Sequence, residues 1–98
     1  MTKKTNFKAL DPILHSQLRL TIVSYLMSTE SSDFNEIKRI TKATSGNISI
    51  QLKKLQKVGY ILLEKGFLNN YQHTSIKITK KGIIAFENYV QALKDYIE

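Results

Sequence analysis

The stretch from Thr44 to Ile61, TSGNISIQLKKLQKVGYI, decides the fold that this sequence predicts. Small polar residues and a glycine open the stretch, and the apolar residues Ile48, Leu52 and Leu55 follow at helical spacing. At about 100° per residue these three side chains share one face of a helix, whereas Ile50 falls on the opposite face. The pattern therefore predicts a helix that packs one face on a core and carries an isoleucine among lysines on the other.

The outer face of this predicted helix combines small, polar and basic side chains. It carries Gly46, Ile50, Lys53, Lys54 and Lys57, flanked by Asn47 and Ser49. Such a face suits the major groove of DNA, where glycine permits close approach, amides and hydroxyls bond to bases, and isoleucine meets a thymine methyl group. A plainer interpretation leaves Ile50 half covered by a neighbouring loop and treats the lysines as a solvated surface.

The residues around this stretch predict a small domain that is mainly helical. Amphipathic helices are expected over residues 16–28 and 34–41, before the helix of the opening stretch. Strands are expected over 60–65 and 75–79, with the polar residues 66–74 as a long hairpin tip, and a last helix follows. The predicted fold class is α+β, mainly α with a small β-hairpin, in the order α-α-α-β-β-α.

Capping residues mark the ends of these elements. Asp11 before Pro12 predicts a short turn of helix, and Ser16 is a second candidate cap. Asp33 with Glu36 three residues later forms a capping box, which explains both carboxylates more simply than general acid and base chemistry. The other expected capping residues are Thr44 or Ser45 for the third helix, Gly59 at its end, and Thr79 for the last helix.

Length and charge limit the class of protein. The chain has 98 residues, the size of one domain, and no cysteine, which removes disulfides, thiolate zinc sites and a cysteine nucleophile. Its net charge is +7. Residues 34–60 hold six basic residues and one acidic residue, whereas residues 82–98 hold one lysine and three acidic residues. This surplus favours a polyanionic partner, nucleic acid first. Residues 1–8 are expected to form a loose basic arm whose end Phe7 and Leu10 anchor.

The sequence contains no motif for catalysis, cofactor binding or membrane insertion. No apolar core follows the first lysines, so neither a signal peptide nor a membrane span is expected, and a cytoplasmic location fits. A Gly-rich phosphate loop and a nucleophile elbow are both missing, so we expect no enzyme and no cofactor. His15 and His73 lie far apart in the sequence and predict no metal site, and no polar cluster marks a site for a small effector.

The opening stretch resembles the recognition-helix segment of small winged helix-turn-helix transcriptional regulators related to the MarR and ArsR groups. It has their small polar start, their S-x-x-L-x-x-L core and their G-[YL]-[IV] end. LDPILHSQLRLTIVSYL is similar to their first helices, and EKGF and ITKKG to their wing and closing helix, so the resemblance covers about residues 9–97. The groove-facing residues that it implies are Ser45, Gly46, Asn47, Ser49, Ile50, Lys53 and Lys54.

The same resemblance makes residues 65–74 the wing. The contacts expected from the wing and from the flanks of the helix are Lys38, Lys42, Lys57, Lys65, Asn69, Asn70, Gln72 and His73. The arginine that such wings carry is missing, so amides without charge would reach groove edges or phosphates. Asn69 and Asn70 also suit a simple turn, and the resemblance implies that Phe67 packs under the wing.

The last helix has an apolar stripe that is broad for so small a domain. Its members are Phe86, Tyr89, Val90, Leu93 and Ile97, beside Ile83. The stripe can fold back on the first helix or pair with a second chain, and its breadth favours both. Together with the resemblance, whose family forms two-fold dimers in this way, the stripe predicts a homodimeric transcriptional regulator that binds double-stranded DNA sequence-specifically. Two alternatives are a protein-interaction winged helix that docks an acidic partner, and a single-strand binder that stacks bases on Tyr60, Phe67 and Tyr71.

Overall fold

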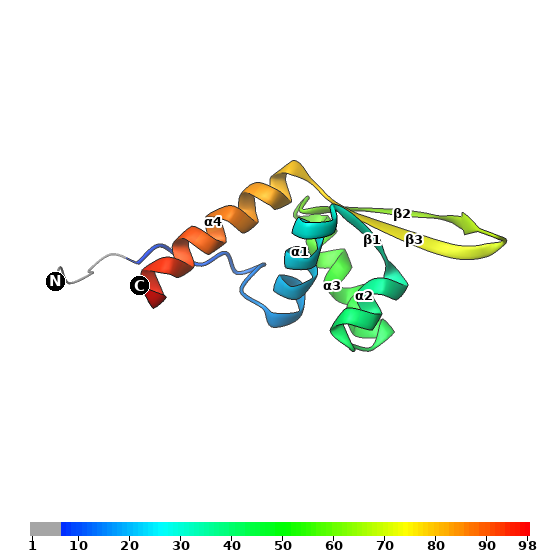
Figure 1. The fold of residues 1–98 in the computed structure, drawn as a ribbon, viewed down its shortest axis with the longest axis horizontal. Coiled ribbons are helices and arrows are strands. Elements are labelled where there is room, and N and C mark those ends of the chain that lie inside the picture. The colour runs from blue at the N-terminus through cyan, green and yellow to red at the C-terminus, as the bar shows by residue number, and fades with distance from the viewer. Residues whose placement is uncertain (1–6) are drawn as a thin grey trace.

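Four helices and three strands make up the chain in the computed structural model, which describes residues 7–98. Their bounds are α1 (Gln17–Thr29), β1 (Ser31–Asp33), α2 (Phe34–Thr41), α3 (Ser45–Lys57), β2 (Ile61–Leu68), β3 (Tyr71–Ile78) and α4 (Lys80–Ile97). Helices α1, α2 and α3 form the body, the β2–β3 hairpin extends from one end, and α4 projects from the other (Figure 1). The predicted fold class and all four helices are confirmed. Most of the predicted basic arm, residues 1–6, lies outside the described residues.

The core forms where the apolar faces of the three body helices meet the base of the sheet. Its fully buried side chains include Ile22 and Leu26 of α1, Ile37 of α2, and Ile48 and Leu55 of α3. Each such burial contributes roughly 1.5–3 kcal/mol, which fixes the three helices against one another. The predicted inner stripe of α3 is therefore confirmed.

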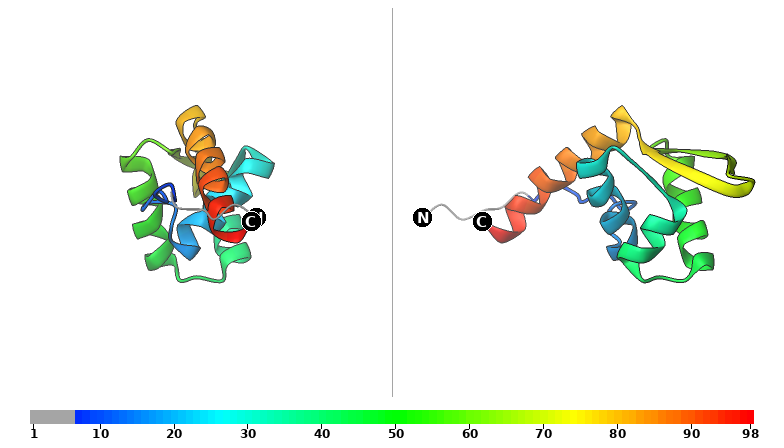
Figure 2. Two further views of the ribbon diagram at one scale, coloured as in Figure 1. Left: turned by 90° about the vertical axis from the view of Figure 1, so that its left-hand side faces the viewer. Right: turned by 45° about the vertical axis from the view of Figure 1, so that its right-hand side comes forward.

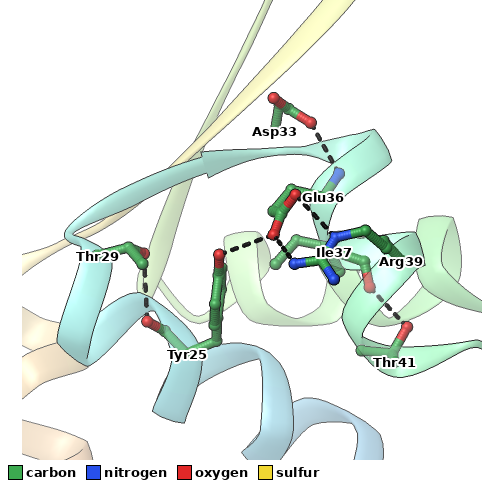
Figure 3. A network of polar contacts seen from close by, with 7 residues as sticks. All are labelled: Tyr25, Thr29, Asp33, Glu36, Ile37, Arg39 and Thr41. Carbon is green, nitrogen blue, oxygen red and sulfur yellow. Dashed lines mark hydrogen bonds and ion pairs between the residues drawn. The ribbon is translucent and has the colours of Figure 1, made fainter.

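Polar residues stand at the starts of the helices of the body, with three departures from the prediction. Asp33 accepts a hydrogen bond from the Glu36 backbone N–H at 2.8 Å, which is one half of the predicted capping box. The Glu36 carboxylate does not complete the box; it accepts hydrogen bonds from Tyr25 and Arg39 instead (Figure 3). Ser16 stands at the cap position of α1 without a side-chain cap bond, and Asp11 begins a hydrogen-bonded turn rather than a helix.

A third strand, β1, was missed by the sequence analysis. Its residues Ser31 to Asp33 pair antiparallel with β3, opposite Lys77 to Ser75, and the sheet order is β1-β3-β2. Three polar residues carry no apolar alternation, so they read as a loop. Their backbone hydrogen bonds tie the link between α1 and α2 to the sheet.

The β2–β3 hairpin is longer and tighter than predicted. Its strands pair from Ile61 opposite Ile78 to Leu68 opposite Tyr71, so residues 66–74 belong to the strands and the turn and form no long loop. Asn69 and Asn70 make a two-residue turn with φ of 52° and 67°. Positive φ at both positions is the type I′ geometry that matches strand twist, and asparagine tolerates it.

The start of α4 is held closely against the base of the hairpin. Thr79 caps α4 by accepting from the Gly82 N–H at 3.0 Å, and its hydroxyl donates to the Gly59 carbonyl at 2.6 Å. Gly59 has a φ of 82°, as predicted for the residue after α3. The C-terminal half of α4 then leaves the body, on the side opposite the hairpin (Figure 2). There Phe7 packs against Tyr96 with ring centroids 5.0 Å apart, which gives the N-terminal segment its predicted anchor.

Candidate nucleic-acid interface

The outer face of α3 is bare in the folded chain. Ile50 is 54% exposed, although Ile48 beside it is completely buried. The other predicted groove-facing residues are exposed or, for Ser49, partly exposed: Ser45, Gly46, Asn47, Ser49, Lys53 and Lys54. The remainder of the Ile50 surface is covered by its own chain, so the interpretation in which Ile50 is half covered stays an alternative to the groove-facing one. A single exposed aliphatic side chain among lysines lowers the stability of the fold little. Its exposed apolar surface can therefore contact a partner.

The first turn of α3 leaves room for a partner to approach the helix backbone closely. Thr44 caps the helix by accepting from the Asn47 N–H at 3.2 Å. A methyl group placed on Gly46 would meet no atom within 4 Å, so this side of the helix is open space. The free N–H groups of a helix start also carry partial positive charge, which favours phosphate.

A groove brings α3 and the hairpin together. It has a volume of about 580 Å³ and is lined by Phe34, Ser49, Leu52, Lys53, Gln56, Leu63, Lys65, Gln72 and Thr74. The predicted helix residues Ser49 and Lys53 thus share a surface with the predicted wing residues Lys65 and Gln72. The other predicted basic flanks, Lys38, Lys42 and Lys57, are exposed on α2, on the turn after it and on the last turn of α3.

The two faces of the hairpin carry different residues. Lys65, Phe67 and Gln72 lie on the face that continues the partly buried Leu63 and the buried Ile76, because side chains alternate along a strand. His73 lies on the opposite face, so the predicted wing contacts Gln72 and His73 point away from each other.

The exposed tip of the hairpin corrects one expectation. Phe67 is 80% exposed and does not pack under the wing, and Tyr71 is 78% exposed. Asn69 and Asn70 are exposed as well, but their backbone conformation is already explained by the turn.

A hydrogen-bonded chain behind α3 was missed by the sequence analysis. Arg19 of α1 donates from Nη1 to Gln51 Oε1 at 2.5 Å and from Nε to the Ile13 carbonyl at 2.6 Å. Gln51 Nε2 in turn donates to Asn47 Oδ1 at 2.9 Å. The spacing of four between Asn47 and Gln51 is a sequence signal for a helical side-chain pair. Arg19 is 32 residues from Gln51, and nothing local in the sequence indicates that contact.

The apolar stripe of α4 is divided between the core and the surface. Tyr89 is 5% exposed and bonds to His15 Nδ1 through its hydroxyl at 3.0 Å, while Phe86 and Leu93 pack against the core. Tyr89 is thus occupied within its own chain. Val90 is partly buried and Ile97 is 73% exposed. Ile84 and Tyr96, which the prediction did not include, are 48% and 49% exposed.

Two polar contacts shift the pKa values of side chains that hold the body together. Burial, followed by the hydrogen bond to Asp11, raises the pKa of Tyr60 to about 12. The hydrogen bonds from Arg39 and Tyr25 lower the pKa of the Glu36 carboxyl.

Within residues 7–98 no helix has the length and apolar character to span a membrane, and no group of three acidic or histidine side chains is placed to hold a metal ion.

Comparisons with known proteins agree with this geometry. The family model for the winged helix DNA-binding domain matches residues 18–97. An uncharacterized protein of Methanocaldococcus jannaschii is 37% identical over 78 residues, which cover 80% of this chain and 85% of that protein.

Solved structures share the fold. A transcriptional regulator homologue from Pyrococcus horikoshii superposes with a TM-score of 0.80 at 25% identity, over 87% of this chain and 84% of its own. A mutant MarR from E. coli, complexed with operator DNA, has a TM-score of 0.67 at 17% identity, over 84% of this chain and 58% of that chain. With its exposed basic α3, its hairpin wing and a family match over most of its length, the chain belongs to the winged helix DNA-binding domain family.

Proposed function

We propose that this protein is a cytoplasmic, non-enzymatic transcriptional regulator that binds double-stranded DNA sequence-specifically as a homodimer. The observation that carries the proposal is the bare outer face of α3, where Ile50 is 54% exposed among lysines. The structural likeness to a transcriptional regulator homologue and to MarR bound to operator DNA supports it.

In this proposal the N-terminal half of α3 enters the major groove. Ser45, Asn47 and Ser49 bond to base edges or phosphates, Gly46 allows the helix backbone to come close, and Ile50 contacts a thymine methyl group. Phosphate contacts then fall to the basic side chains around the helix, which are Lys38, Lys42, Lys53, Lys54 and Lys57.

The wing contributes at the edge of the site. Lys65 and Gln72 share the groove with Lys53 of α3, so they are placed to follow the same DNA backbone. His73 lies on the opposite face of the hairpin, and Asn69 and Asn70 lie at its tip. These three residues contact phosphates only if the DNA wraps around the wing. The missing arginine leaves the wing with a weak minor-groove contact.

The dimer is proposed to form through the end of α4. Exposed apolar side chains gather there: Phe7, Tyr96 and Ile97. Ile84 is also exposed but lies near the start of α4. Val90 and the outer edges of Phe86 and Leu93 can add to the contact, while Tyr89 stays in its own core. This end lies opposite the hairpin, so a two-fold pair leaves both α3 helices free for major grooves about 34 Å apart.

The test is titration of fluorescent duplex DNA, comparing the region upstream of the protein's own gene with random duplex. If each subunit neutralises about three phosphates, log K against log salt should fall with a slope near −5. Preference for the upstream duplex that survives 200 mM salt is the expected result. Equal affinity for both duplexes, or none for either, would contradict the proposal.

Two substitutions connect the binding to α3. Ile50→Ala and Asn47→Ala should each leave the free energy of unfolding within roughly 0.5 kcal/mol, because both side chains are exposed. Each should weaken specific binding by about 1–3 kcal/mol. Leu62→Ala is the matched control, since Leu62 is an aliphatic residue that is 58% exposed on the outer face of the hairpin. It should leave DNA affinity unchanged.

The second candidate is a protein-interaction domain that docks an acidic partner. The exposed apolar side chains at the hairpin tip favour it, because Phe67 and Tyr71 are 80% and 78% exposed. Lack of any preference for duplex DNA in the titration would support this candidate over the regulator.

A further inference from the structure

The hydrogen bonds from Arg19 to Gln51 and from Gln51 to Asn47 form a network with a fixed donor-to-acceptor direction. Arginine has only donors, so the group that faces Arg19 Nη1 must be an acceptor. Gln51 meets this condition with Oε1 at 2.5 Å. Its amide nitrogen is therefore turned the other way, toward Asn47.

The same logic orients Asn47. Gln51 Nε2 is a donor, so Asn47 must offer its oxygen, and the distance to Oδ1 is 2.9 Å. Among the described residues, the NH2 group of Asn47 makes no hydrogen bond. The side chain is exposed on the first turn of α3. Both hydrogens of its NH2 group are therefore left for a ligand, whereas Gln51 takes one of the two lone pairs of its oxygen.

Arg19 is itself held in place. Its Nε donates to the Ile13 carbonyl at 2.6 Å, in the turn that precedes α1. Arg19 and Gln51 are both partly buried between α1 and α3, whereas Asn47 is at the surface. Partial burial raises the cost of leaving a donor or acceptor unpaired, so rotating the Gln51 amide by half a turn would break both of its contacts.

We propose that Arg19, acting through Gln51, is a positioning residue that sets the base preference of Asn47. The inference rests on the proposed function, in which α3 lies in the major groove. An asparagine with both amide groups free pairs with adenine, because it accepts from N6 and donates to N7. With one lone pair of its oxygen taken by Gln51, Asn47 keeps two N–H donors and a single lone pair. Guanine offers two acceptors in the major groove, N7 and O6, whereas adenine and thymine offer one each, so Asn47 selects guanine and most disfavours cytosine, whose N4 is a donor.

The test is selection of binding sites from a randomised duplex pool by the full chain and its variants. Asn47→Ala identifies the base pair that depends on Asn47. We expect the wild-type chain to select guanine there by roughly 5- to 100-fold over the other bases. Selection of any base other than guanine at that position by the wild-type chain would overturn the inference.

Gln51→Glu should reverse the preference. A carboxylate accepts from Arg19 with one oxygen and presents its other oxygen to Asn47. Asn47 then turns its NH2 group inward and its oxygen outward, so it selects a base with a donor, cytosine N4 or adenine N6. Gln56→Glu is the control, because Gln56 is an exposed glutamine of α3 that takes no part in the Arg19–Gln51–Asn47 hydrogen bonds. It adds the same charge and should lower overall affinity without changing the selected base.

Arg19→Met gives a second, independent variant. It keeps the aliphatic stem and removes the donors, so Gln51 is free to rotate and the preference of guanine over adenine should fall toward equality. Circular dichroism confirms that each variant is folded. An unchanged guanine preference in folded Arg19→Met or Gln51→Glu would overturn the inference while leaving DNA binding intact. A wild-type chain that selects no sequence at all would instead contradict the proposed function.

Discussion

Replacing Gly82 by alanine tests the closest packing in the fold. A Cβ at this position would lie 2.3 Å from the Tyr60 carbonyl oxygen and 3.1 Å from Ile78 Cγ1. The carbonyl belongs to the backbone at the base of the hairpin, and it accepts the Thr79 N–H at 3.0 Å. Because the carbonyl oxygen is a backbone atom, it cannot rotate away, so the start of α4 must move outward.

The expected cost follows from two opposing effects. Overpacking of this kind costs about 3 kcal/mol at the upper end of its usual range. Alanine in place of glycine within a helix returns about 1 kcal/mol. The net loss is therefore about 2 kcal/mol, which with a urea m-value of about 1.5 kcal/mol/M lowers the unfolding midpoint by about 1.3 M.

Gly46→Ala is the matched comparison, because it is the same substitution in another helix. No atom lies within 4 Å of its added Cβ, so only the helix preference remains and the chain should gain about 0.5 kcal/mol. Urea unfolding followed by circular dichroism, at one protein concentration for all variants, measures both changes. Equal effects of the two substitutions, or no loss from Gly82→Ala, would refute the packing explanation. Gly46→Ala should at the same time weaken DNA binding, because its methyl group points to the approaching duplex.

Three further changes probe contacts of the body and of α4. Tyr60→Phe removes the hydrogen bond to Asp11 and should cost about 1 kcal/mol at neutral pH in urea unfolding. Because folding raises the pKa of Tyr60 from 10.0 to about 12, the wild-type chain loses this contribution as pH rises from 10 to 12, and the variant should lack that loss. Arg39→Ala should raise the lowered pKa of Glu36, which an NMR titration measures. In the wild-type chain the contact stabilises the fold above about pH 4.5 and weakens as pH falls through the folded pKa. An unchanged pKa of Glu36 in the variant would contradict this role of Arg39. Ile97→Asp, at a side chain 73% exposed, should leave the circular dichroism spectrum intact and reduce the sedimentation mass to that of a monomer; a dimer that persists would exclude this end of α4 as the interface.

The helix that decides the fold could be predicted in detail because its signals are local. Ile48, Leu52 and Leu55 repeat at the helical period, and a threonine cap and a glycine stop bound the segment. All three apolar side chains are buried, and Ile50 is exposed. Periodicity, caps and stops depend on neighbours within four residues, so no knowledge of the tertiary structure was needed.

The hairpin and β1 were misjudged because their order comes from pairing partners. Gly66, Phe67 and Leu68 lack the alternation of a half-buried strand, since this part of the hairpin extends beyond the body and is exposed on both faces. Its register is set by the Asn69–Asn70 turn, which the sequence indicated only as one of two readings. β1 has no apolar residue at all and is a strand because β3 offers it hydrogen bonds.

The grouping of the exposed apolar side chains indicates contact surfaces that no single exposed residue indicates. In residues 7–98 they fall into three groups: Ile50 on α3; Leu62, Phe67, Leu68 and Tyr71 on the hairpin; and Phe7, Ile84, Tyr96 and Ile97 around α4. An isolated exposed aliphatic residue needs no explanation, but contiguous patches mark contact surfaces. Tyr96 and Ile97, in the last turn of α4, lie at the end opposite the hairpin (Figure 1), whereas Ile84 lies near the start of α4. A dimer contact at that end would cover apolar surface without covering α3, and this separation allows one small domain to serve a partner subunit and a duplex at the same time.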